Sequence, residues 1–201
     1  TGGDLIFDVL RGNRARADSL FALYTQTVKG FKMPIHHVIG NHELFGIYAE
    51  SPIQPDDPDY KYGMFKKYLG DTYYSFDHKG WHFIALNSID ERNKRYIGII
   101  DEAQKEWLRK DLESVKPGTP IVVVTHIPFV SVQHQIIPPR NPIPPAPNEN
   151  WISNRNEILN MFKGHNLRLV LQGHLHWVED IKVENTRFIT NPRLPRRAPE
   201  R

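Results

Sequence analysis

The chain has 201 residues, no cysteine and a hydrophobic content of 39%. This length suits a single domain with its own core, and the lack of cysteine excludes disulfides and thiolate metal sites. No apolar run approaches the roughly 20 residues that a membrane-spanning helix needs. The net charge of +3 comes from residues 193–201, which hold four Arg and one Glu; the remaining 22 basic and 22 acidic residues balance. Binding to a nucleic-acid backbone draws on many Lys and Arg contacts. The absence of a net charge in residues 1–192 therefore argues against nucleic acid as a partner.

Helical and extended patterns alternate along the chain, which predicts a layered α/β fold. We expect a helix that starts at Asp101, where Gln104 completes a variant of the capping box. Its apolar stripe should hold Ala103, Trp107, Leu108, Leu112 and Val115. The other expected elements are a helix at 18–29, a strand at 35–39, a hairpin of 73–76 and 81–87, a strand at 121–124, a helix at 153–163, a strand at 167–171 and a hairpin at 181–190.

Two segments are predicted to have no regular secondary structure. Residues 138–147 contain six prolines, which cannot continue a helix or lie in a central strand. We expect a stiff surface insertion there, and a polyproline segment that binds a partner is the alternative. The basic tail at 193–201 is typical of a solvated, disordered end, although such a tail can also bind nucleic acid or an acidic surface.

Polar side chains follow three of the apolar, β-rich runs at the point where each run ends. The three stretches are Gly40-Asn41-His42-Glu43, Thr125-His126 and Gly173-His174-Leu175-His176, and Gly2-Gly3-Asp4 opens the chain. Sites in open α/β sheets form outside the carboxyl ends of the strands. Carboxylate, amide and imidazole groups together suit Mn, Fe, Zn or Ni. The sequence therefore indicates a metal site with Asp4, Asn41, His126, His174 and His176 as candidate ligands.

Each candidate also has an ordinary structural reading. Asp4 resembles a helix cap or a turn residue. Asn41 follows a glycine, as turn asparagines do. His126 is also explained as a buried, hydrogen-bonded histidine. The order and spacing of the stretches, rather than any one residue, favour metal ligation.

These residues resemble the calcineurin-like metallophosphoesterase superfamily, whose members share five blocks. The second to the fifth appear here in order, from Gly3 to His176, with Gly-Asn-His-Glu and Gly-His-Leu-His as the most specific. The first block, Asp-x-His, is absent, and we expect a chain truncated at the N-terminus. Phe7 stands where the second block has an acidic residue, and Asp8 comes one position later. Phe7 cannot bind metal, which argues against the purple acid phosphatases, where this position is a metal-binding Tyr.

The resemblance implies a four-layer α/β/β/α sandwich over residues 1–192, followed by the tail. It implies two transition metals in the complete protein and one in this chain. Asp4, Asn41, His126 and His174 would bind one metal. His176 and Asp4 would bind the other, together with two residues of the missing block.

The implied activity is hydrolysis of a small-molecule phosphomonoester or phosphodiester by a metal-bridging hydroxide, without a covalent enzyme intermediate. His42 would protonate the leaving oxygen or stabilise the transition state, which suits imidazole in general. Apart from the resemblance, Glu43 could orient His42 or be a surface carboxylate. His134 lies shortly after His126 in the sequence and is a candidate to reach the substrate. The alternative is a catalytically silent fold that acts as a protein-binding module. With half of one metal site missing, we expect the truncated chain itself to have little activity.

Overall fold

The computed structural model describes residues 1–133 and 149–192. His134, the proline-rich segment at 138–147 and the tail at 193–201 lie outside the described residues, so these three expectations stay predictions. Among the described helices, none combines the length and the hydrophobicity that are needed to cross a bilayer.

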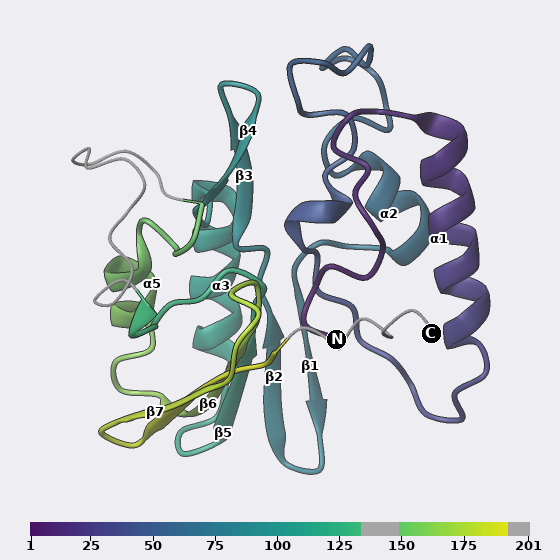
Figure 1. Cartoon of the computed structure of the whole chain (residues 1–201). Coiled ribbons are helices and arrows are strands. Elements are labelled where there is room, and N and C mark those ends of the chain that lie inside the picture. The colour runs from purple at the N-terminus through teal and green to yellow at the C-terminus, as the bar shows by residue number, and fades with distance from the viewer. Residues whose placement is uncertain (134–148, 193–201) are drawn as a thin grey trace, which may run out of the picture.

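A mixed six-stranded sheet organises the fold (Figure 1). The strand order is β1-β2-β5-β6-β8-β7; β2, β5, β6 and β8 run parallel, and β1 and β7 pair antiparallel at the two edges. The bounds are β1 Tyr74–His78, β2 Trp81–Ala85, β5 Pro120–Val124, β6 Asn166–Gln172, β7 Glu179–Val183 and β8 Thr186–Thr190. A separate ribbon is formed by β3 Ile89–Arg92 and β4 Arg95–Gly98.

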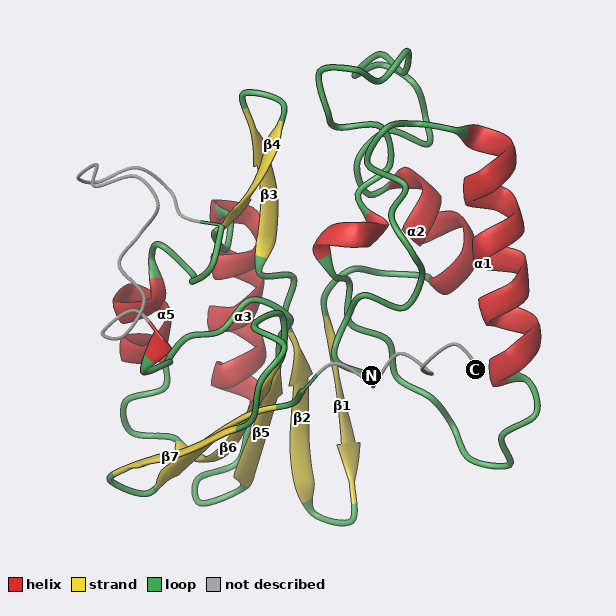
Figure 2. Cartoon of the chain, viewed as in Figure 1, coloured by secondary structure: helices red, strands yellow, loops and turns green. Residues whose placement is uncertain are grey.

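The helices gather on two sides of the strands (Figure 2). Helices α3 and α5 lie together on one side, and α1 and α2 lie together on the other. The helical bounds are α1 Arg14–Val28, α2 Gly63–Leu69, α3 Glu102–Ser114, α5 Arg155–Met161 and the short 3₁₀ helix η1 Asn41–Glu43.

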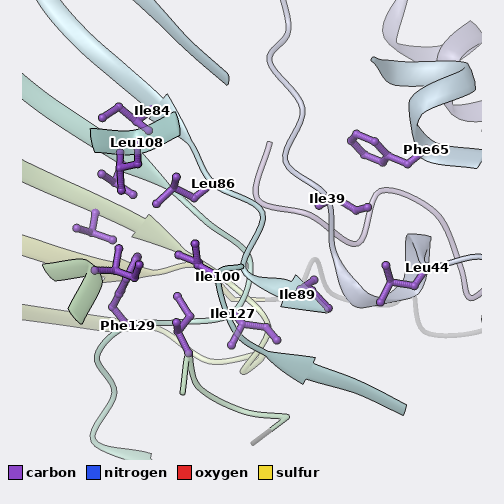
Figure 3. Packing of buried hydrophobic residues seen from close by; sticks show 14 of the residues in the cluster. Ile39, Leu44, Phe65, Ile84, Leu86, Ile89, Ile100, Leu108, Ile127 and Phe129 are labelled. Carbon is purple, nitrogen blue, oxygen red and sulfur yellow. The ribbon is translucent and has the colours of Figure 1, made fainter. Parts of the chain in front are cut away.

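The hydrophobic core lies between the sheet and these helices (Figure 3). Ile121 and Val123 of β5 are buried, as the central strand of a parallel sheet requires. Leu108 of α3 and Ile84 of β2 are fully buried in the same cluster. A central strand held in this way fixes the position of the residue that follows it, His126.

The expected α/β class and the two hairpins are confirmed, but the expected sandwich of two full sheets is not seen in the described residues. There the six-stranded sheet is accompanied only by the β3–β4 ribbon. Neither this ribbon nor α2 was expected from the sequence. The ribbon turns at Asn93 and Lys94, which both have positive φ. Because neither is a glycine, the sequence did not indicate a tight turn here.

The strand expected at 35–39 is not formed. Its backbone bonds to Thr1, far away in the sequence, instead of in a ladder: the Thr1 ammonium donates to the His36 carbonyl at 2.7 Å, and the Val38 N–H donates to Thr1 Oγ1 at 3.4 Å. His36 also stacks on Phe76 of β1, with ring centroids 3.6 Å apart. The apolar run is therefore held beside β1 without becoming part of the sheet.

The buried stripe of α3 also differs from the expectation at one position. Asp101 caps the helix by accepting from the Gln104 N–H at 2.8 Å, as expected. Ala103, however, is exposed, and Gln104 is buried in its place. The Gln104 amide accepts from the Asn87 N–H at 2.9 Å and donates to the Asn87 carbonyl at 2.8 Å. These two bonds satisfy a buried polar side chain that a hydrophobic pattern cannot anticipate.

A buried histidine links β2 to α3. His82 Nδ1 lies 2.7 Å from Asp77 Oδ1, and its Nε2 lies 2.9 Å from Asp111 Oδ2. Ser75 Oγ donates to the other oxygen of Asp111 at 2.5 Å. Burial lowers the pKa of His82, but the hydrogen bonds and charges of Asp111 and Asp77 outweigh it, so the net pKa is raised. The interaction with Asp111 is the stronger one, because the Asp77 side chain is 80% exposed and that of Asp111 only 11%.

We predict that this cluster stabilises the protein most at low pH. The pKa of His82 is higher in the folded protein than in the unfolded one. Its contribution to the free energy of unfolding is therefore fully present below the ordinary histidine pKa of about 6.5, and is lost as pH rises through the higher pKa of the folded state. Chemical denaturation of the parent and of His82→Gln at several pH values should show a stability difference that is largest near pH 6 and shrinks above it. His78→Gln, at the exposed end of β1, is the control. A pH-independent difference would contradict the prediction.

Candidate metal centre

Four side chains from four separate segments converge beyond the carboxyl ends of the central strands. His126 follows β5, His174 follows β6, Asn41 lies in η1 and Asp4 lies in the first loop. His126 Nε2 is 3.3 Å from Asp4 Oδ1, 3.1 Å from Asn41 Oδ1 and 3.2 Å from His174 Nδ1. His174 Nδ1 is 3.0 Å from Asn41 Oδ1. The structure thus places together four of the five predicted ligands.

These separations fit a bound cation. Ligand atoms about 2.0–2.2 Å from a transition metal lie about 3.0–3.4 Å from one another. All four atoms carry lone pairs, and only the two imidazole rings can supply a proton between them. Four electron-rich atoms at such distances repel one another unless a ring proton or a metal ion lies among them. The geometry and the chemistry of the donor set therefore fit a metal ion.

His126 is presented in the form that a ligand requires. Its Nδ1 lies 2.8 Å from the Gly2 carbonyl, which can only accept, so this nitrogen carries the proton and donates. Nε2 is then left to face the other donors. Metal-binding histidines are commonly oriented in this way by a main-chain carbonyl. Burial lowers the pKa of His126, but the charge and hydrogen bond of Asp4 outweigh it and raise the net value.

The two other ionisable donors are held in the form that binds metal. Burial, and then the charge of His126, lower the pKa of His174 to about 3, so that its ring is neutral. Burial opposes ionisation of Asp4, but the charges and hydrogen bonds of His126 and His42 keep the pKa of its carboxyl well below the ordinary value. Neutral imidazole and ionised carboxylate are the binding forms.

Two glycines let the loops approach this closely. A Cβ on Gly3 would lie 2.4 Å from His126 Nδ1, and a Cβ on Gly40 would lie 2.2 Å from the Asp4 main-chain nitrogen. Asp4 and His174 themselves adopt positive φ, 51° and 70°. Such backbone conformations are uncommon for residues other than glycine and concentrate at functional sites.

Glu43 ties two of the donor-bearing loops together. Its carboxylate is fully buried and accepts from the Asp4 N–H at 3.0 Å, the Ile6 N–H at 3.0 Å and the Gly40 N–H at 2.7 Å. Burial and then the charge of Asp4 raise the pKa of Glu43 to about 7, against these main-chain donors. Both expectations for Glu43 were wrong: it neither contacts the His42 ring nor lies at the surface.

His42 lies beside the four donors. Its Nε2 is 4.0 Å from Asp4 Oδ2, and its main-chain N–H donates to Asp4 Oδ1 at 3.2 Å. The ring stacks on Phe7 at a centroid distance of 6.1 Å. Nδ1 is buried and has no hydrogen-bond partner among the described residues. Contacts with Asp4 and Phe7, rather than with Glu43, therefore hold the ring that was predicted to be catalytic.

His176 stays apart from the four-donor cluster. It lines the same cleft, of about 390 Å³, as Asp4, His126 and His174. However, the group of ionisable donors that lie within 4.8 Å of one another contains Asp4, His126 and His174 without it. Its assignment to a second metal stays a prediction. One further residue was missed from the sequence: Tyr96 of β4 presents its ring to His174 edge-on at 6.0 Å, and nothing around Tyr96 in the sequence signals this.

The fold and this donor set define a mixed α/β domain with a candidate metal centre. The family model described as calcineurin-like phosphoesterase matches residues 2–178. The chain therefore belongs to the calcineurin-like phosphoesterase family, which confirms the resemblance seen in the sequence.

Solved structures agree on the fold. A dimetal phosphatase from Danio rerio matches with a TM-score of 0.56 at 16% identity, over 89% of this chain and 67% of that one. The phosphopantetheinyl hydrolase PptH from Mycobacterium tuberculosis matches with a TM-score of 0.50 at 15% identity, over 93% of this chain and 77% of that one. A search of curated proteins finds no match.

We predict that Glu43 supports metal binding without contacting the metal. Glu43→Gln keeps the size of the side chain but turns one acceptor into a donor that faces main-chain N–H groups. Loss of such outer contacts typically costs about 10–100-fold in metal affinity. Calorimetric titration with Mn²⁺ should show this loss, whereas Glu50→Gln, at an exposed position, should match the parent. Equal affinity in all three proteins would show that Glu43 does not position the donors.

Proposed function

We propose that this chain is the core of a metal-dependent phosphoesterase that hydrolyses a small-molecule phosphomonoester or phosphodiester. The convergence of Asp4, Asn41, His126 and His174 carries this proposal. These four residues would hold one ion, of Mn, Fe, Zn or Ni, and His176 would contribute to a second in the complete site. Metal ions at such a site activate water and neutralise the charge that develops on phosphate.

The composition of the cleft supports a need for metal. The residues that line it in the described part of the chain are Gly2, Gly3, Asp4, His126, Gly173, His174, His176, Asn191 and Pro192. None of these is Lys or Arg, so a phosphate group would find no permanent cationic side chain in the cleft. The Asp4 carboxylate would repel it further. Bound metal is the source of positive charge that these residues are suited to hold.

His42 would act on the leaving group. It stands at the side of the donor set, where its Nε2 reaches to within 4.0 Å of Asp4 Oδ2. From this position the ring would donate a proton to the departing oxygen, and its stack with Phe7 would hold it beside Asp4. No covalent enzyme intermediate is part of this proposal, because the described residues that line the cleft include no serine or cysteine.

Metal content tests the donor assignment. After loading with Mn²⁺ and dialysis, the chain should retain about one ion, and His126→Ala should retain almost none, because the variant removes the donor closest to the other three. His165→Ala, outside the donor set, should match the parent. Two tightly held ions, or none in the parent, would count against the assignment. Metal binding by the complete protein without hydrolysis of any mono- or diester would favour a protein-binding role instead.

A leaving-group series tests His42. In the complete protein, His42→Ala should lower turnover of alkyl phosphoesters by about 10²–10⁴-fold while metal content is unchanged. The loss should be much smaller for 4-nitrophenyl esters, whose leaving group needs little protonation. Rates for both substrate types and metal analysis of the same samples give the result. An equal loss for both types would point to stabilisation of transition-state charge, and loss of metal would make His42 a ligand.

A further inference from the structure

A second cavity opens at Phe7, the residue whose ring stacks on His42. Its volume is about 300 Å³, and it is lined by Phe7, Asp8, Val9, Arg11, Gly12, Asn13 and Arg16. This volume is at the lower end of the range for small-molecule sites. None of these residues lines the metal-centre cleft, so the two cavities are separate.

A row of contacts leads from the metal centre to this cavity. Asp4 is 4.0 Å from the ring nitrogen of His42, His42 stacks on Phe7 at 6.1 Å, and the Arg16 guanidinium lies over the Phe7 ring at 5.8 Å. A group that left phosphorus on the His42 side would therefore meet Phe7 first and Arg16 next. This order places the cavity where the leaving part of a substrate would lie.

Phe7 gives this cavity an aromatic wall. Its side chain is 58% exposed, although large apolar residues are usually buried. The His42 ring is stacked near it at an interplanar angle of 23°. An exposed ring beside a catalytic histidine offers a stacking surface for a planar group, since bases stack well on aromatic side chains.

The charges around the cavity favour an anion. Arg11 and Arg16 are positive and Asp8 is negative. Asp8 lies 3.5 Å from Arg11 and also accepts from the Leu10 N–H, so it is already engaged. Within the described residues, Arg16 has its contact with Phe7 and no carboxylate at ion-pair distance. Its long exposed side chain is therefore available to turn towards a phosphate.

From these observations we propose that the cavity of Phe7, Arg11 and Arg16 binds a nucleotide, the leaving part of a phosphodiester substrate. The base stacks on Phe7. The phosphate group that the nucleotide itself carries, distinct from the scissile one, is held by Arg16 with Arg11. The proposal rests on the phosphoesterase function and narrows its substrate class to nucleotide-containing diesters. Hydrolysis of the P–O bond adds water across it, and the proton from His42 leaves on the nucleotide hydroxyl. The released nucleotide is then a ligand of this cavity by itself.

Binding of AMP to the metal-free chain tests this cavity directly. Calorimetry in the presence of EDTA should detect AMP, with adenosine and inorganic phosphate each binding at least about 10-fold more weakly. Phe7→Leu should weaken AMP about 10-fold, in line with the loss of one base–aromatic stack. Arg16→Gln should weaken AMP but leave adenosine unchanged.

Matched controls separate this cavity from general surface effects. Phe31 is 58% exposed, as Phe7 is, and Phe31→Leu should bind AMP like the parent, as should Arg168→Gln at an exposed position of β6. Absence of AMP binding at millimolar concentration would overturn the proposal. AMP binding that is unchanged in both Phe7→Leu and Arg16→Gln, or that requires metal, would also overturn it.

The outcome is distinguishable from a failure of the phosphoesterase function. If AMP binding depends on Phe7 and Arg16 but the complete protein hydrolyses no phosphoester after metal loading, the nucleotide cavity stands and the catalytic role falls. If hydrolysis occurs while AMP binding is unchanged by substitution of Phe7 and Arg16, the catalytic role stands and the nucleotide cavity falls.

Discussion

The buried carboxylate of Glu43 is the contact on which the arrangement of the donors depends. It accepts main-chain hydrogen bonds from the loop that carries Asp4 and from the loop that carries Asn41. Neither loop is part of the six-stranded sheet. His126 and His174, in contrast, follow β5 and β6, which pair with each other in parallel. The sheet therefore fixes two donors, and one buried side chain holds the other two against them.

This arrangement restricts the sequence more tightly than the ligands themselves do. Gly3 and Gly40 must lack a Cβ because the imidazole of His126 and the backbone of Asp4 occupy that space. The Gly2 carbonyl orients His126. Residues without ligand atoms of their own thus decide whether the ligand atoms meet. A variant at any of these positions changes the centre through geometry, while the donor set itself stays intact.

The convergence of the candidate donors could be predicted from the sequence more readily than parts of the surrounding fold. Each of His126 and His174 follows an apolar run that does become a parallel strand, so their convergence follows from topology. The role of Glu43 could not be read in this way, because a carboxylate in a Gly-Asn-His-Glu stretch gives no sign that it is buried. The run at 35–39 looked like a strand, but its backbone bonds with Thr1. Phe7 appeared only as a residue unable to bind metal, and its exposed position beside His42 emerged from the structure.

X-ray absorption at the metal edge tests the central claim, that these four side chains form one coordination site. The spectrum of the chain loaded with one equivalent of Zn²⁺ should show a first shell of nitrogen and oxygen at about 2.0–2.2 Å, with outer-shell scattering from two imidazole rings. His174→Ala should reduce that scattering to a single ring. A first shell without imidazole scattering, or a spectrum unchanged in His174→Ala, would show that the metal binds elsewhere and would contradict the account.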